Sequence, residues 1–173
     1  MEAQQEMTNE GQGIAEEPQE MGDPIHHLRV LHNNPFIFSS PIVAFFSSLG
    51  EKEQALLLGY LVLPITLHLP SRKYLGKVRS SSNLRTMLQD RCRLHGLDER
   101  VARYREMSNT TFQFLLSSGG ISVSRQLVVT VNEHQPMDAP TPEGVIKAAR
   151  QLGSFFRPYD VPTVFRMLGV MSL

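Results

Sequence analysis

The sequence predicts a mainly α-helical domain with one small β-hairpin. Apolar residues recur at helical spacing in several segments that begin at capping residues and end at glycine or proline. Only the stretch at about 120–131 has the alternating, β-branched pattern typical of strands. The 173 residues are 41% hydrophobic, which is enough for one core. We therefore expect a single helical domain over residues 25–173.

Residues 1–24 differ from the rest of the chain in charge. They contain seven acidic residues, no Lys or Arg, and few aliphatic side chains. Such a segment cannot bury enough apolar surface to offset the entropy of ordering it, so we expect a disordered acidic tail. The tail either solubilises the chain or shields a basic face. Residues 25–173 contain 17 basic and ten acidic residues and so carry a net charge of +7, although the net charge of the whole chain is zero.

The first two helices are expected on either side of Gly50. Ser40 is a suitable N-cap and Pro41 a suitable first residue for a helix that ends at Gly50. A second helix is expected from 51 to about 63, where Pro64 ends or kinks it. The short apolar stretch after this proline has no clear type. The longest apolar run is shorter than the roughly 20 residues that a membrane span needs.

The middle of the chain predicts two further helices. One runs from residue 84 to about 94, capped by the polar residues before it and ended by Gly96. The next covers 98 to about 116, with apolar residues at i, i+3 and i+4. Arg100 and Arg103 fall off that apolar stripe and are expected to face water or a partner.

The C-terminal part predicts the hairpin and two more helices. A helix over about 145–156 has a continuous apolar stripe, and a short last helix over 161–167 ends at Gly169. The order helix, helix, hairpin is also that of winged-helix modules, so a winged-helix-like adaptor is one form this domain can take.

The strongest compositional signal is a basic region between Arg72 and Arg105. It holds ten basic and three acidic residues, which accounts for the whole excess of the ordered part. Such a region can bind phosphates, bind an acidic protein, or form a solvated face whose Arg stems pack on the core. The candidate DNA- or partner-contact residues are Arg72, Lys73, Lys77, Arg79, Arg85, Arg100 and Arg103.

No arrangement of residues indicates an enzyme, a cofactor or a metal site. The cluster of His26, His27 and His32 lacks acids or cysteines at ligand spacing. Cys92 lies between two arginines, which favours a reactive thiolate, but a plain structural thiol is the simpler interpretation. His68 lies between leucines, as a hydrogen-bonded core histidine would. A single cysteine excludes an internal disulfide and fits a reducing, cytoplasmic location.

Several segments together resemble a known family. They are Asn34-Pro35, the run from Leu63 to Arg72, the serines at 80–82, the stretch 114–121, and the segments 148–156 and 163–170. In order and spacing they are similar to the small middle component of bacterial ABC-type three-component systems, the group that includes Lamassu-type phage-defence operons. Phe155-Phe156 stand where such a helix would be expected to carry a tryptophan.

The resemblance implies a non-catalytic adaptor. It would bridge an ABC ATPase of the structural-maintenance-of-chromosomes (SMC) type, which senses DNA, and an effector that is often a nuclease. DNA would then be contacted through the complex, and no catalytic residues carry over. The C-terminal helices would supply core and interface residues, among them Phe155, Phe156 and Phe165.

Two other functions stay open at this point. The first is a free-standing winged-helix transcriptional regulator that presents the helix 98–116 to a DNA groove. Asp98, Glu99 and Glu106 on that helix would approach phosphates badly. The second is a small enzyme that uses Cys92 or a histidine, for which the sequence offers no constellation.

Overall fold

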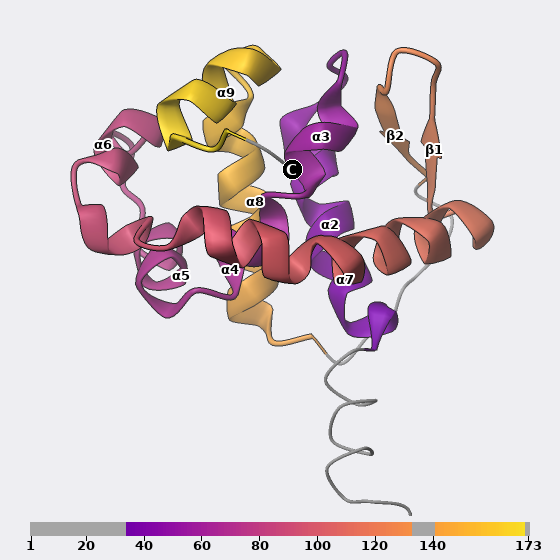
Figure 1. Cartoon of the computed structure of the whole chain (residues 1–173), viewed down its shortest axis with the longest axis horizontal. Coiled ribbons are helices and arrows are strands. Elements are labelled where there is room, and N and C mark those ends of the chain that lie inside the picture. The colour runs from indigo at the N-terminus through magenta and orange to yellow at the C-terminus, as the bar shows by residue number, and fades with distance from the viewer. Residues whose placement is uncertain (1–33, 133–140, 172–173) are drawn as a thin grey trace, which may run out of the picture. The chain divides into compact units, whose positions relative to one another are not determined.

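The computed structural model describes residues 34–132 and 141–171. The expected acidic tail and the histidine cluster at 26–32 lie outside the described residues. The described part is mostly helical with one antiparallel hairpin, as predicted (Figure 1). In chain order the elements are α2 (Pro35–Leu49), α3 (Ala55–Gly59), α4 (Val62–Thr66), α5 (Leu69–Gly76), α6 (Leu84–Leu88), the 3₁₀ turn η1 (Arg91–Arg93), α7 (Leu97–Ser117), β1 (Ile121–Val123), β2 (Val129–Val131), α8 (Glu143–Phe156) and α9 (Val161–Leu168).

Helices α2 and α8 form the centre of the core and pack backbone to backbone. Gly153 of α8 makes this possible, because a Cβ built there would lie 2.4 Å from the carbonyl oxygen of Phe45. Phe45 and Phe156 meet edge to face, with ring centroids 5.9 Å apart, and both are fully buried. Helix α7 runs across these two helices in Figure 1, and its apolar stripe, including Phe112 and Leu115, closes the core.

Helix α2 begins six residues earlier than expected. Asn34 caps it by accepting a hydrogen bond from the Phe36 N–H at 3.0 Å, and Pro35 takes the first position. Pro41, the expected start, therefore lies inside the helix and donates no hydrogen bond to the carbonyl of Ile37. The hydroxyl of Thr141 donates to that carbonyl instead. The prediction of a start at Ser40 was wrong because a distant side chain satisfies the group that proline leaves open.

The second expected helix is broken into α3 and α4. Gln54 precedes α3 with a left-handed backbone (φ 59°), so residues 51–54 form a turn rather than a first helical turn. Pro64 neither ends nor kinks a helix, because it is the third residue of α4, where an N–H has no intrahelical partner. Gly59 at the end of α3 lies against the ring of Phe112, 2.6 Å from where its Cβ would be. The end of α3 thus packs closely on α7 where only glycine fits.

The region 65–96 also differs in detail from the expectation. Residues from Leu69 form α5, which the sequence left undecided. Helix α6 has a capping box between Asn83 and Thr86 but ends at Leu88, earlier than predicted. The Asp90 side chain accepts the N–H of Cys92 at 3.0 Å and starts the separate turn η1. Gly96, with φ 63°, begins α7 rather than ending the preceding helix.

The hairpin and the last helices agree with the sequence. β1 and β2 pair antiparallel, with Ser122 opposite Thr130. Main-chain bonds from Gln54 to Gln126 and from Leu56 to Leu127 hold the hairpin turn against α3. α7, α8 and α9 lie within two residues of their predicted bounds, and Gly169 ends α9 with φ 72°.

No single helix within the described residues is long and apolar enough to cross a membrane. The stretch Ala55–Thr66 and α5 are long and apolar enough only when taken together, and the chain bends by 100° between them. Leu58, Leu61 and Ile65 of this pair are fully buried in the core.

Candidate partner-docking surface

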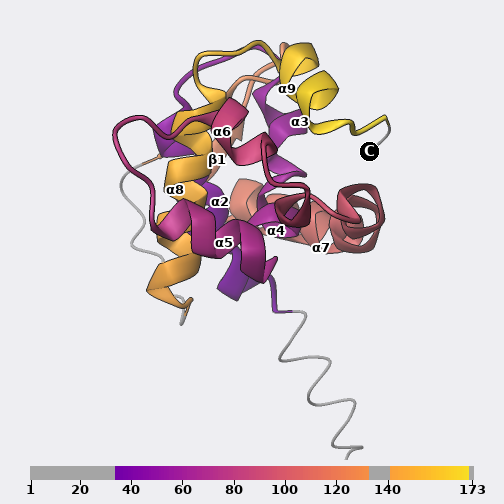
Figure 2. The same ribbon diagram turned by 90° about the vertical axis from the view of Figure 1, so that its left-hand side faces the viewer.

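Helix α5 presents the first residues of the basic region to the solvent. Ser71 and Leu75 are buried against the core, and Lys73 and Lys77 are exposed on the other side. Arg79 and Arg85 follow in the loop and in α6, and both are exposed. In Figure 2 α5 lies at the front, with α6 above it. We call Leu69, Lys73, Gly76 and Lys77 the α5 face, and these residues together with Arg72, Arg79 and Arg85 the basic surface.

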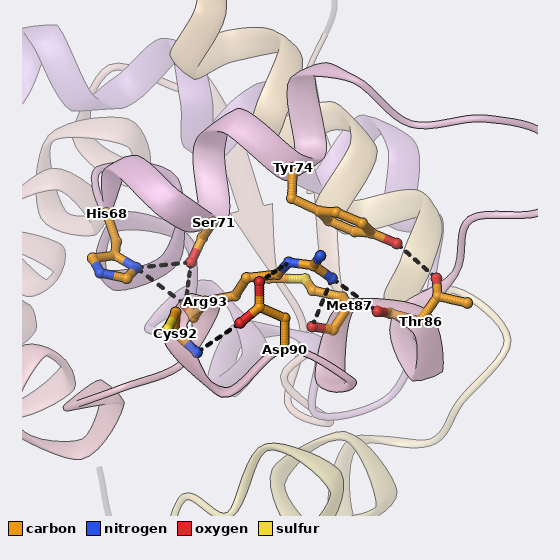
Figure 3. A network of polar contacts seen from close by, with 8 residues as sticks. All are labelled: His68, Ser71, Tyr74, Thr86, Met87, Asp90, Cys92 and Arg93. Atoms are coloured by element: carbon orange, nitrogen blue, oxygen red, sulfur yellow. Dashed lines mark hydrogen bonds and ion pairs between the residues drawn. The ribbon is translucent and has the colours of Figure 1, made fainter.

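A network around Arg93 holds α5, α6 and η1 together (Figure 3). The Arg93 guanidinium lies 3.9 Å from the centroid of the Tyr74 ring and donates to the carbonyls of Thr86 at 2.9 Å and Met87 at 3.3 Å. These carbonyls belong to α6, where a helix of this length leaves them without an intrahelical partner. Asp90 lies 3.3 Å from the guanidinium, and the Tyr74 hydroxyl bonds the Thr86 hydroxyl at 2.6 Å. Arg93 thereby fixes the surface that α5 and α6 form.

His68 and Ser71 join the same network from the start of α5 (Figure 3). The Ser71 hydroxyl donates to the Arg93 carbonyl, and His68 Nδ1 lies 3.0 Å from Ser71 Oγ and 3.1 Å from that carbonyl. Burial lowers the pKa of His68 below its usual value, and the positive charges of Arg100 and His95 lower it further, against the hydrogen bond to the Arg93 carbonyl. The neutral ring with its proton on Nδ1 fits this geometry.

The pKa of His68 predicts a pH dependence of stability. Because the folded-state pKa lies below the unfolded value, acidification protonates the unfolded chain first and favours unfolding. The free energy of unfolding is therefore expected to fall as the pH drops through about 6.5 and to level off below the folded-state pKa. Urea titrations of the wild type and His68→Gln between pH 5 and 8 measure this effect. The pH dependence of the free energy of unfolding that the wild type shows and His68→Gln lacks is the contribution of His68. If this free energy depends on pH equally in both proteins, the assignment to His68 is contradicted.

The serine–histidine pair is not arranged for nucleophilic catalysis. Ser71 is fully buried and gives its proton to a main-chain carbonyl rather than to His68. A base must accept the proton of the nucleophile, and the nucleophile must reach a substrate. Cys92 is exposed, and its main-chain N–H rather than its thiol donates a hydrogen bond to Asp90. Among the described residues no three His, Cys, Asp or Glu side chains are grouped as a metal site would require.

Lys52, Arg93 and Arg100 bind main-chain carbonyls of the fold rather than facing a partner. Lys52 donates to the carbonyls of Phe156, Arg157 and Tyr159 and so caps the end of α8. Arg93 caps α6 as described. Arg100 donates from Nε to the Pro64 carbonyl at 3.1 Å and from Nη1 to the His95 carbonyl.

The expectation that Arg100 faces water or a partner was therefore wrong. It is half-buried and links α7 to the end of α4, and burial lowers its pKa. Arg103, one turn further along α7, is exposed as expected. Arg103 borders a shallow hollow of about 230 Å³ together with Glu106, Met107 and Thr110. The carboxylate of Glu106 therefore lies in the same hollow as the Arg103 guanidinium.

The remaining predicted basic residues form no ion pair with a carboxylate within 34–132 and 141–171. Arg72 is half-buried on the flank of α5, and the others are exposed. Arg72, Lys73, Lys77, Arg79 and Arg85 thus lie on α5, the following loop and α6, and Arg100 and Arg103 lie on α7.

The three phenylalanines expected in core or interface belong to the core to different degrees. Phe156 and Phe155 are 0% and 4% exposed, which leaves no surface for a partner. The Phe155 ring of α8 packs on the Tyr74 ring of α5, with centroids 6.4 Å apart, and so holds α5 against the core. Phe165 of α9 is half-buried and packs on the edge of the core.

Sequence reasoning missed Arg93, Tyr74 and Gly76. Arg93 looked like one more base of the basic region, because its role depends on the turn η1 that places it over Tyr74. Gly76 could have been noticed, since a glycine inside a helical segment lowers helix stability and needs a reason.

Comparison with known proteins gives one result. Neither a curated protein nor a solved structure matches this chain. The family model of the ABC-three component (ABC-3C) system Middle Component 3 matches residues 23–172, which is most of the chain and all of its described helices. The chain therefore belongs to the family of middle components of ABC-three component systems.

Proposed function

We propose that this chain is a non-catalytic adaptor subunit of a bacterial antiphage defence complex. It bridges an SMC-like ABC ATPase that senses DNA and an effector, a nuclease in the simplest case. The complex acts in the cytoplasm and meets DNA as an assembly. Family membership supports a role beside other components, and the Lamassu-type resemblance supports the defence role.

The observation that carries the proposal is the basic surface. Five cations stand on α5, the following loop and α6 without a carboxylate partner in the described part of the chain. A network of charge-assisted hydrogen bonds holds their backbone in place. A rigid, unneutralised surface of this kind suits docking better than a solvated face does, because little ordering entropy is lost on binding.

A pull-down from the native operon tests the adaptor role. The tagged full-length chain is expressed with its operon neighbours, and the eluate is analysed by native mass spectrometry. A stoichiometric complex with a large ABC ATPase is the expected result. A lone monomer or dimer would overturn the proposal, and selection of DNA sites on the isolated chain would then test the regulator function.

Charge reversal of the basic surface is expected to abolish defence. Lys73→Glu, Lys77→Glu and Arg79→Glu together change exposed side chains that make no ion pair within the described residues, so the fold should persist. Efficiency of plating measures the loss of phage protection, and circular dichroism with a melting curve checks the fold. Full protection by a folded triple variant would remove the basic surface from the function.

A further inference from the structure

The α5 face combines exposed apolar and positive groups. Leu69 and Lys73 are four residues apart and lie on one side of the helix, and exposed Lys77 follows directly as its C-cap residue. Leu69 is 48% exposed, whereas the other α5 leucine, Leu75, is fully buried. This side points away from Ser71 and Leu75, which face the core.

Within the described residues, packing gives no reason for a glycine at Gly76 on the same face. A Cβ built there would meet nothing within 4 Å, and its φ lies outside the left-handed region. Glycine in a helix lowers stability, so its presence here is unexplained by packing or by the backbone. The missing side chain lets another chain approach the backbone of α5 closely between Lys73 and Lys77.

The charge of the surroundings determines what can approach. Lys73 and Lys77 have no carboxylate partner in 34–132 or 141–171, and Arg79 and Arg85 add to the same sign. An anionic occupant would therefore complement the charge of this face. It would also cover an exposed leucine, which favours protein over DNA, since protein interfaces surround an apolar centre with a charged rim and DNA interfaces are more polar.

We propose that the α5 face binds an acidic segment of another subunit of the same ABC-three component system. Carboxylates of the segment pair with Lys73 and Lys77, and an apolar side chain covers Leu69. The backbone of the segment passes over Gly76. This inference rests on the adaptor function proposed above and names the chemistry of the partner that the basic surface takes.

Two variants of the α5 face test the inference in the full-length chain, co-expressed with its operon subunits. Lys73→Glu with Lys77→Glu reverses the charge, and Gly76→Leu fills the open space over the helix. Matched controls are Arg125→Glu with Lys147→Glu, two exposed cations in the hairpin turn and in α8, and Gly144→Leu, whose built Cβ also meets nothing within 4 Å.

Native mass spectrometry over a dilution series measures how strongly each variant assembles with the other subunits. Each α5-face variant is expected to weaken assembly by roughly tenfold or more at an unchanged melting temperature, and the controls to assemble like the wild type. Lys73→benzoylphenylalanine is expected to photo-crosslink to a segment of a partner subunit rich in Asp and Glu. Reversing acids of that segment should restore assembly with the Lys73→Glu, Lys77→Glu variant.

Three outcomes would overturn the inference. If the complexes with both variants stay intact and only their affinity for a labelled 40-base-pair DNA duplex falls, the face binds DNA. If neither assembly nor DNA affinity changes, the face binds no partner. If the wild-type chain itself forms no complex, the adaptor function fails, and the inference that rests on it fails for that separate reason.

Discussion

Gly153→Ala is expected to lower the free energy of unfolding by about 3 kcal/mol, although alanine is the better helix former. The added Cβ would lie 2.4 Å from the Phe45 carbonyl oxygen and 3.0 Å from the Leu49 nitrogen. Both atoms belong to the backbone of α2, which cannot rotate away as a side chain can. Helices α2 and α8 would have to separate, and the contact between Phe45 and Phe156 would loosen with them. Urea unfolding followed by circular dichroism measures the effect.

Gly144→Ala in the same helix is the matched control. Nothing lies within 4 Å of a Cβ at Gly144, and its backbone is not left-handed. The substitution should therefore raise stability by about 0.5–1 kcal/mol, because alanine has less conformational entropy to lose on folding. Equal effects of the two substitutions would show that α2 and α8 are not in backbone contact at Gly153.

Arg93→Ala is expected to lower the free energy of unfolding by about 2 kcal/mol. The carbonyls of Thr86 and Met87 lose their charged donor, and the Tyr74 ring loses the guanidinium that covers it. The Asp90 pair adds little, since that carboxylate is half exposed. Because η1 and α6 would detach from α5, hydrogen exchange should rise over 84–93 and not over 143–156.

Two further variants separate geometry from charge at this position. Arg93→Lys keeps the charge but not the planar fork, so it should lose most of the same stability. Arg91→Ala, which removes a neighbouring exposed cation whose side chain makes no hydrogen bond or ion pair in the described residues, should change stability by less than about 0.5 kcal/mol. A larger loss at Arg91 than at Arg93 would contradict the capping role. Loss of assembly by folded Arg93→Ala protein would further connect the network to the basic surface.

The sequence by itself determined the elements whose signals are local and unopposed. Helices α7 and α8 have long apolar stripes, α9 ends at a glycine with positive φ, and the hairpin has β-branched alternation between turns. In each of them the periodicity of apolar residues by itself indicates the observed element, although none of the three helices has a side-chain N-cap. The charge of the basic region was also evident, because composition does not depend on how the chain folds.

Only the tertiary structure decided the start of α2 and the division of 51–66. Asn34-Pro35 and Ser40-Pro41 are equally good local starts, and the Thr141 hydroxyl, a hundred residues away, makes the earlier one possible. Tertiary packing likewise determined which cations serve the fold. Arg93 and Arg100 look like Lys73 and Lys77 in the sequence, but they reach main-chain carbonyls that only the packed helices bring near. Local rules act over a few residues, whereas a free donor or acceptor is satisfied by whatever the fold places beside it.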